Sequence, residues 1–204
     1  MPRFQRRKED RPAEITDAAL ATFAEKGYAQ TRVSDVAKRA GVSKGLLYLY
    51  FKTKEELFKA VIRSFVSPRF EALIESMDQT ESAEAFLRGP FLRFAKMLPR
   101  SPARILIRLM IAEGPKHPDL VAWYWQTIVS KAIPALSRLI QRGVDNGEFK
   151  PSAIQQFPHL LVAPVFFSTV FQMVFQDQAE LDSDAMMEAH IETVLSAIKV
   201  SDHG

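Results

Sequence analysis

The sequence predicts an all-α protein, and three observations support this. Apolar residues recur at helical spacing along the chain, and beyond residue 57 no stretch alternates apolar and polar residues as a half-buried strand does. No Asn-Gly turn joins two apolar runs, so a β-hairpin is not indicated. Proline and glycine instead separate segments that are long enough for helices, about nine in the 204 residues.

The first helix is expected to follow a basic arm at residues 1–11. Pro12 suits a first helical turn, and Ile15 and Phe23 lie on one apolar face of the helix that follows. Gly27 is expected to end this helix, because a residue without Cβ adopts positive φ at little cost.

Residues 31–57 are expected to form two short helices joined by a sharp turn, followed by a third helix. Thr31 can cap a helix from about 32 to 40, Gly41 permits the turn, and Ser43 can cap the second helix. Thr53, followed three residues later by a glutamate, is the expected cap of the third helix.

The second of these helices has two distinct faces. Leu47 and Phe51 are four residues apart and share a face that can pack, while Lys44 and Tyr48 share another that stays available. A helix with one packed face and one free face is what a DNA-reading element needs.

The residue order of this segment is T-R-V-S-D-V-A-K-R-A-G-V-S-K-G-L-L-Y-L-Y-F-K-T-K-E-E-L. It resembles the DNA-binding motif of the TetR/AcrR family of bacterial transcriptional regulators, and departs from it at Thr53, where serine or asparagine is usual. The resemblance covers about a quarter of the chain. It implies a helix-turn-helix domain over residues 1–56 and a helical effector-binding and dimerisation domain over residues 57–204.

Side-chain chemistry within the motif suggests how it contacts double-stranded DNA. Hydroxyl and ammonium donors suit phosphate oxygens, and Lys54 at the start of the third helix is expected to hold one. Lys44 can donate to guanine, Gly45 allows close approach, and Leu46 can contact a thymine methyl. Tyr50 either contacts DNA or is partly buried under its helix. The predicted DNA-contacting residues are Thr31, Ser34, Ser43, Lys44, Gly45, Leu46, Tyr48, Tyr50 and Lys54.

Charge is distributed unevenly. Residues 1–60 hold 13 Lys and Arg against 8 Asp and Glu, whereas residues 61–204 hold 14 against 16. A basic N-terminal part favours a polyanionic partner. The basic arm, which contains Arg3, Arg6, Arg7, Lys8 and Arg11, is either a solvated tail or lies along a DNA groove.

Other classes of function find little support in the sequence. The chain has no cysteine, which excludes disulfides and thiolate metal sites, and its four histidines show no metal-binding spacing. No glycine-rich phosphate loop or catalytic serine turn occurs, so an all-α enzyme is only a remote alternative and no cofactor is expected. No N-terminal signal segment is visible, and the expected location is the cytoplasm.

Beyond the motif, the pattern predicts helices only. Pro68 and Pro134 each fall inside a predicted helix and are expected to kink or divide it just upstream. The predicted helices cover residues 54–76, 82–98, 102–113, 118–146, 152–176 and 183–199.

The run from 157 to 175 is apolar enough to raise the question of a membrane span. Pro158, Pro164 and Gln172 interrupt it and no positive cluster flanks it, which disfavours that reading. A helix that is apolar on nearly all sides is otherwise buried on nearly all sides. The resemblance implies that the helices near 152–176 and 183–199 form a homodimer that reads a palindromic operator.

The resemblance also implies a small-molecule effector, for which we expect a hydrophobic or amphipathic compound that releases a repressor from DNA. Each candidate lining residue is also compatible with plain core packing. The alternative is a DNA-binding regulator or architectural protein without an effector. The candidate lining residues are Phe65, Phe94, Met97, Arg108, Met110, Trp123, Phe167 and Phe171.

Overall fold

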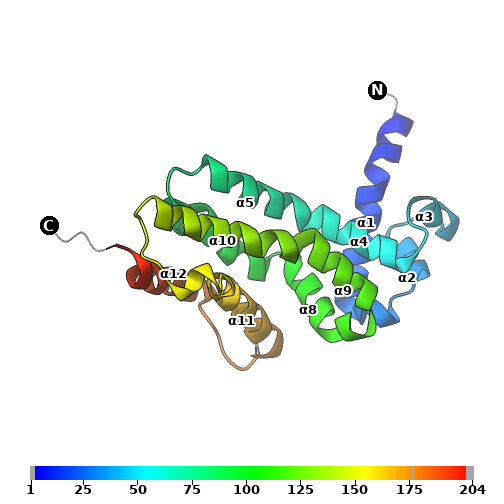
Figure 1. The fold of residues 1–204 in the computed structure, drawn as a ribbon. Helices are drawn as coiled ribbons and strands as arrows, with labels where there is room; N and C mark the ends of the chain where they lie inside the picture. The colour runs from blue at the N-terminus through cyan, green and yellow to red at the C-terminus, as the bar shows by residue number, and fades with distance from the viewer. Residues whose placement is uncertain (1–2, 176, 201–204) are drawn as a thin grey trace. The chain divides into compact units, whose positions relative to one another are not determined.

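The computed structural model describes residues 3–175 and 177–200, with side chains from residue 11 onward. Helices make up most of this part of the chain (Figure 1). Within it, the β-like pairing consists of one isolated antiparallel bridge between Phe149 and Lys199. The all-α prediction is therefore confirmed.

The chain divides into two compact units. The first comprises the chain up to Pro68 together with Ile105–Ala122, and the second comprises Arg69–Arg104 and the chain from Trp123 onward. The domain boundary expected between residues 56 and 57 falls inside the first unit. It lies within α4 (Lys54–Phe65), a helix with a buried apolar face.

The first helix, α1 (Arg3–Gln30), begins earlier than the sequence indicates. Its backbone is already helical before Pro12, so residues 3–11 continue the helix and do not precede it as an arm. Proline removes one backbone N–H, and here the helix passes through it. Because the side chains of residues 3–10 lie outside the described part, DNA contact by the basic arm stays a prediction.

The helix breaks at Gly27, as its sequence predicts. Gly27 has φ 76° and ψ 170°, a backbone conformation that residues other than glycine rarely adopt. Beyond this break the Tyr28 ring lies 5.7 Å from the Phe23 ring and 5.2 Å from the Phe58 ring, measured between centroids. These three buried aromatic side chains join α1 to α4.

Three local predictions are confirmed in the helix-turn-helix, α2 (Val33–Arg39) and α3 (Lys44–Tyr50) with the start of α4. Gly41 has φ 65° in the turn. The Ser43 hydroxyl accepts a hydrogen bond from the backbone N–H three residues later at 3.1 Å, and the Thr53 hydroxyl does the same at 3.0 Å. Both side chains satisfy a backbone donor that the first turn of a helix leaves unpaired.

A later part of the chain completes the first unit. It contains most of α8 (Ala103–Glu113), the short helix η3 (Gly114–Lys116) and the start of α9 (Pro118–Tyr124). Leu106 and Leu109 on α8 are buried. The start of α9 at Pro118 agrees with the sequence prediction.

The two internal prolines have different effects. The helix divides just upstream of Pro68, between α4 and α5 (Ser67–Gln79), as predicted. Pro134 lies inside α10 (Ser130–Asp145) without ending it. A π-helical turn, η4 (Trp125–Val129), precedes α10 and is the kind of irregularity at which helices bend.

The nine predicted helices correspond to twelve α-helical segments in the described residues, because three longer predicted helices are each divided in two. In the same part of the chain, no helix has the length and apolar character needed to cross a membrane. The remaining segments are α6 (Ala83–Phe86), η1 (Leu87–Phe91), α7 (Leu92–Met97), η2 (Leu98–Arg100), η5 (Ala153–Gln155), α11 (His159–Phe175) and α12 (Ser183–Ile198).

The core of the second unit depends on a close approach between α10 and Phe149. A Cβ atom added to Gly143 would stand 2.3 Å from Cδ2 of the buried Phe149 ring, so a glycine is needed there. The neighbouring Glu148 carboxylate accepts the backbone N–H groups of Ala83 and Glu84 at 3.1 and 3.0 Å. This carboxylate therefore caps the start of α6.

Exposed ion pairs connect α12 to the segment that runs from α6 to η2. Such pairs contribute little individually, but they run along the length of the two elements. The pairs are Lys199 with Glu84, Arg88 with Glu192, Lys96 with Glu188, and Arg100 with Asp184.

Candidate nucleic-acid interface

The helix α3 has one fully buried residue, and the side opposite that residue is exposed. Leu47 is its buried residue. At 100° per residue, Gly45 and Leu49 lie on the side opposite Leu47. Leu49 is 71% exposed, more than any other large apolar side chain among the described residues. We call Gly45 and Leu49 the outer face of α3.

Sequence reasoning did not assign Leu49 to DNA contact. Leu49 was assigned no contact because Leu47 and Leu49 are both apolar, and either leucine of a short amphipathic helix could be the one that packs. The available signal was its separation of two residues from Leu47, which places it about 200° around the helix. Leu49 is exposed and Gly45 has no side chain, so this side of α3 is free to approach a groove of DNA.

The flanks of α3 carry the polar candidates. The Lys44 ammonium lies 5.7 Å from the centre of the Tyr48 ring, so the two side chains form one group on the flank. Leu46 and Tyr50 are half-buried on the other flank, and Ser34 is exposed on α2. The hydroxyl of Ser43 is already used as an acceptor in its cap.

Thr31 is not placed as the sequence suggests. It is 2% exposed, and its hydroxyl donates to the Gly27 carbonyl oxygen at 2.6 Å, so it neither caps α2 nor faces a phosphate. The cap position belongs to Arg32, whose backbone N–H donates to Oδ2 of Asp35 at 3.3 Å. A hydrogen bond from Lys26 lowers the pKa of Asp35, and the Arg32 N–H lowers it further.

Lys54 also has partners that the sequence does not indicate. Its ammonium donates to the carbonyl oxygens of Tyr28 at 2.9 Å and Ala29 at 3.1 Å, and lies 4.5 Å from the centre of the Tyr28 ring. Burial lowers the pKa of Lys54. The structure therefore gives this lysine an intramolecular role that uses two of its three N–H donors, and the expected phosphate contact stays a prediction. In the same turn, Glu56 accepts the N–H of Lys52 at 2.7 Å instead of that of Thr53.

Within the first unit, α8 and His117, the residue that follows η3, also contact the last part of α1. Oε1 of Glu113 accepts the Ala29 N–H at 3.4 Å, and the His117 ring meets the Tyr28 ring edge-on at 4.7 Å. Arg108 donates to the Ala24 carbonyl oxygen. Burial, followed by the charge of Glu55, raises the pKa of Tyr28 to about 12.

Comparison with known proteins decides the family. A model described as bacterial regulatory proteins, tetR family, matches residues 15–61, and a model described as Tetracyclin repressor-like, C-terminal domain, matches residues 77–194. The chain belongs to the TetR family. It is a transcriptional regulator, and α2 and α3 form its helix-turn-helix.

Two curated relatives from Bacillus subtilis align over most of their length. The uncharacterized HTH-type transcriptional regulator YfiR is 28% identical over 204 residues, which cover 93% of this chain and 94% of the relative. The fatty acid metabolism regulator protein is 27% identical over 205 residues, which cover 94% of this chain and 98% of the relative. A solved structure of the transcriptional regulator FadR from Bacillus subtilis, in complex with stearoyl-CoA, superposes with a TM-score of 0.72. It is 26% identical and covers 90% of this chain and 97% of that chain.

The effector residues expected for this TetR regulator fall in both units. Phe65, Arg108 and Met110 belong to the first unit, and the other five belong to the second. Arg108 is already engaged with a backbone carbonyl. Phe167 is 55% exposed, and its ring lies 5.8 Å from that of Phe171. A lining role for the set stays a prediction.

The polar residues that interrupt α11 are mostly satisfied within the second unit. The Thr169 hydroxyl donates to the Val165 carbonyl oxygen at 2.8 Å, and Gln172 donates to the Ser183 hydroxyl at 3.1 Å. Among the described residues, the fully buried Ser168 hydroxyl has no partner.

His190 on α12 is a further polar residue in this region. The backbone of Leu160 hydrogen-bonds its ring, while Nε2 is buried and without a partner in the described part of the chain. Burial lowers the pKa of His190. No group of three or more histidine, aspartate or glutamate residues in the described ranges is arranged to hold a metal ion.

Proposed function

We propose that this TetR regulator is a homodimeric repressor that binds a palindromic operator through the outer face of α3 and is released by an amphipathic acyl compound. Its role is regulatory and not catalytic, and it acts in the cytoplasm, where bacterial operators lie. The observation that carries the DNA-binding part is the exposed outer face of α3, opposite the buried Leu47.

The proposed contacts follow from the position of each group. Leu49 meets base edges in the major groove, where a thymine methyl offers an apolar partner, and Gly45 lets the backbone approach. Lys44 donates to guanine or to a phosphate from the flank. Ser34, Leu46, Tyr48 and Tyr50 border this surface and complete the proposed set. Thr31, Ser43 and Lys54 are left out because their polar groups make hydrogen bonds within the protein.

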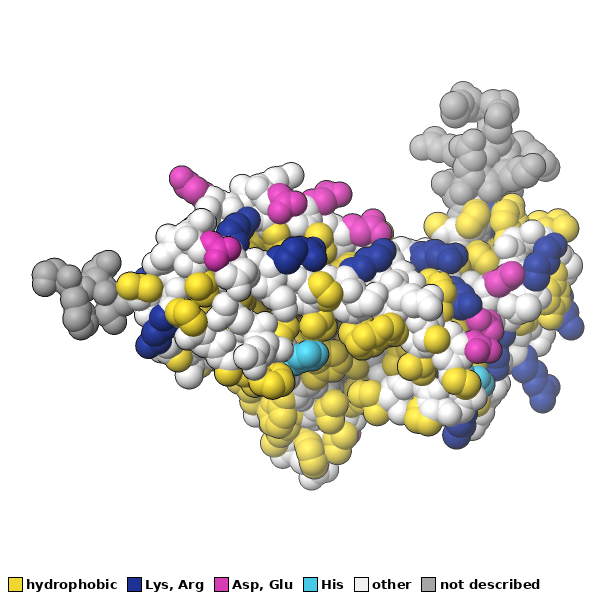
Figure 2. Space-filling view, in the orientation of Figure 1, with side chains coloured by type: hydrophobic (Ala, Val, Ile, Leu, Met, Phe, Trp, Pro, Cys, Tyr) yellow, Lys and Arg dark blue, Asp and Glu magenta, His cyan; other side chains and the backbone are white. Residues whose placement is uncertain are grey.

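The dimer is proposed to form through α11 with α12. Figure 2 shows hydrophobic side chains gathered over α11. An exposed apolar helix face of this size marks an interaction surface, and a second copy of the chain presents the same face for a symmetric contact. Two α3 helices about 34 Å apart would then read successive major grooves. The exposed apolar residues in or next to α11 are Phe157, Leu160, Phe166, Phe167, Val170, Val174 and Phe175.

The proposed effector class rests on two comparisons. The structure of the 26%-identical FadR holds stearoyl-CoA, and a relative of 27% identity is named as a fatty acid metabolism regulator. The second unit supplies aromatic and methionine side chains that suit an acyl chain, among them Phe94 and Met97. A panel of acyl-CoA compounds should include one that raises the melting temperature and releases DNA, because a ligand specific for the folded state stabilises it.

The DNA-binding proposal is tested by selecting operator sites from random duplexes and then comparing variants on the selected site. Leu49→Ala removes three carbons from each α3 helix of the dimer. Each buried methylene contributes about 0.8 kcal/mol, so even partial burial of Leu49 at both half-sites predicts a loss of roughly tenfold or more in affinity. Val200→Ala shortens an exposed apolar side chain in the second unit and serves as the matched control. Selection of no palindrome, or equal affinity of Leu49→Ala and the control, would contradict the proposal.

A further inference from the structure

The outward half of α3 carries few hydrogen-bonding side chains. At about 100° per residue, four residues lie within about 90° of the direction opposite the buried Leu47. They are Gly45, Leu46, Tyr48 and Leu49. Of these four side chains, only that of Tyr48 has a polar atom, the hydroxyl at the far end of its ring. A helix that reads bases by hydrogen bonds instead presents residues such as arginine, asparagine or glutamine.

Leu46 and Leu49 form an apolar pair on one flank of this half, which we call the leucine pair. They are three residues apart, so their side chains are neighbours on the helix surface. Leu49 is 71% exposed and Leu46 is half-buried, so contact with DNA can bury further surface of both. Tyr50 on the same flank lies further round towards the packed side, and its ring is 6.5 Å from that of Phe51. The outward part of this flank is therefore apolar.

The polar side chains of α3 lie on the opposite flank. The Lys44 ammonium is 5.7 Å from the centre of the Tyr48 ring, so the two polar ends stay together. Around the helix, Leu49 is about 100° from Tyr48 and about 140° from Lys44. Bases that meet the leucine pair are thus contacted by apolar groups, while Lys44 and Tyr48 can serve a phosphate or a guanine beside them.

The apolar group that distinguishes base pairs in the major groove is the C5-methyl group of thymine. Bases of one strand follow one another about every 3.4 Å along the axis, and side chains three residues apart on a helix have Cβ atoms about 5–6 Å apart. Two leucines can therefore cover the methyl groups of neighbouring bases. 5-Methylcytosine carries the same methyl group and differs from thymine at C4, where an amino group replaces the oxygen. Leucine neither donates nor accepts a hydrogen bond, so it does not distinguish these two groups.

We propose that Leu46 and Leu49 read the operator through the C5-methyl groups of neighbouring pyrimidines, so that 5-methylcytosine is accepted in place of thymine and unmodified cytosine is not. This inference rests on the proposed binding of the outer face of α3 in the major groove, and it adds the chemical group that determines specificity there. An operator with cytosine at these positions would gain affinity when that cytosine is methylated at C5.

The first test replaces thymine with uracil in the operator selected from random duplexes, one position at a time and in both half-sites. Uracil keeps every hydrogen-bonding group of thymine and lacks only the methyl group. At one or two neighbouring positions, the symmetric pair of substitutions should lower affinity roughly tenfold. A change of less than about twofold at every thymine, or a selected site without thymine, would overturn this inference.

Protein variants then show whether the leucines sense the methyl group, because a methyl group can also act through the shape of DNA. In Leu49→Ala, uracil at the position that Leu49 covers should cost less than about twofold, and Leu46→Ala should show the same at the neighbouring position. Tyr48→Phe is the matched control, because its hydroxyl lies on the opposite flank, and it should keep the full uracil penalty. An equal penalty in Leu49→Ala and the unmodified protein would overturn the inference.

A second duplex series separates the methyl group from the hydrogen-bonding pattern of the base pair. At the same positions, replacing thymine·adenine with cytosine·guanine should weaken binding roughly tenfold, and 5-methylcytosine·guanine should recover most of that loss. Equal affinity for the cytosine and 5-methylcytosine duplexes would again overturn the inference. If Leu49→Ala weakens binding while the methyl group has no effect, the proposed DNA binding stands and methyl reading fails. If no palindrome is selected, both fail.

Discussion

Replacing Lys54 with methionine separates the two roles that its position allows. From the sequence, its ammonium group suits a DNA phosphate at the start of α4. In the structure, that group binds the carbonyl oxygens of Tyr28 and Ala29 and the face of the Tyr28 ring. Methionine keeps the apolar stem of the side chain and removes the charge, so packing changes little.

The expected loss of stability follows from these contacts. A hydrogen bond from a charged donor contributes about 1.5–3 kcal/mol, and a cation above an aromatic ring adds about 0.5–1 kcal/mol at an exposed site. Lys54 is half-buried and its pKa is lowered by burial, so desolvation and solvent screening offset part of this sum. We expect Lys54→Met to lower the free energy of unfolding by about 2 kcal/mol.

The assay combines urea unfolding with operator affinity measured over a range of salt. One phosphate contact per subunit contributes about 0.9 to the slope of log affinity against log salt, so a lost contact in both subunits would lower the slope by about 1.8. We expect the slope of Lys54→Met to stay unchanged. Lys52→Met, at an exposed lysine two residues earlier, is the matched control for stability. A slope lower by about 1.8 with unchanged stability would refute the role assigned to Lys54.

Three further changes have defined outcomes. Gly143→Ala should lower the free energy of unfolding by about 1–2 kcal/mol in urea, because the clash with Phe149 exceeds the gain in helix propensity; equal or higher stability would contradict this. Because burial lowers the pKa of His190, the unfolded chain holds its proton more tightly, and stability falls as the pH drops below about 6.5, by at most about 1.4 kcal/mol per pH unit. His190→Gln should lessen the loss of unfolding free energy between pH 7.5 and 5.5. Equal losses in the variant and the unmodified protein would contradict this role of His190. Phe167→Glu should yield monomers in light scattering, since it puts charge on the exposed face of α11; a persistent dimer would exclude that interface.

Sequence reasoning succeeded where the determining contacts are local. Ser43 and Thr53 each cap a helix through a backbone N–H only three residues away, so the pattern of residue types is sufficient. Gly41 and Gly27 adopt the positive φ values that their positions require. The division before Pro68 follows equally from a proline's own geometry.

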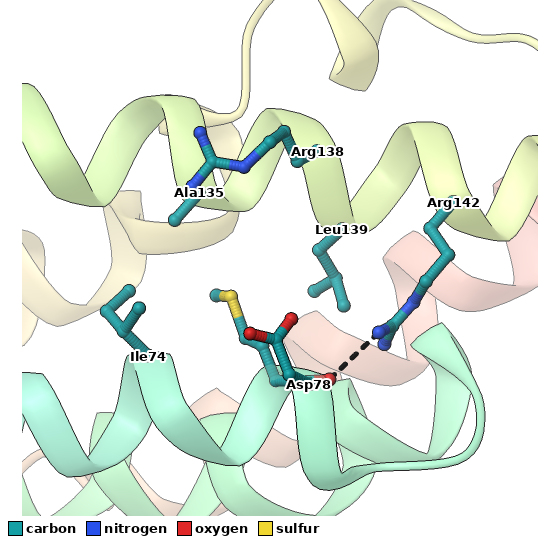
Figure 3. A pocket seen from close by; sticks show the side chains of 7 residues that line it. Ile74, Asp78, Ala135, Arg138, Leu139 and Arg142 are labelled. Carbon is teal, nitrogen blue, oxygen red and sulfur yellow. Dashed lines mark hydrogen bonds between the residues drawn. The ribbon is translucent and has the colours of Figure 1, made fainter.

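Sequence reasoning failed where a side chain finds partners through the fold. Lys54 binds carbonyl oxygens 25 and 26 residues away, and no spacing rule connects it to the end of α1. Thr31 is buried because its hydroxyl donates to the Gly27 carbonyl oxygen at the break in α1. Leu49 was not assigned to the surface because its exposure depends on how α3 is oriented on its neighbours, which the sequence of α3 alone does not reveal. Arg142 on α10 likewise donates to the Met77 carbonyl oxygen on α5, which lies 65 residues away in the sequence (Figure 3).

The packing of α3 has a consequence for how regulators of this kind diverge. Because Leu47 anchors the helix, the positions around it that face outward can change with little effect on folding. On the proposed DNA contacts, substitutions at Gly45 and Leu49 would therefore alter which promoters are recognised while the protein remains abundant in the cell. After gene duplication, a copy could acquire a new set of target genes through a few such changes, without passing through an unstable intermediate. The same separation makes α3 a practical starting point for building sets of regulators that ignore one another's operators.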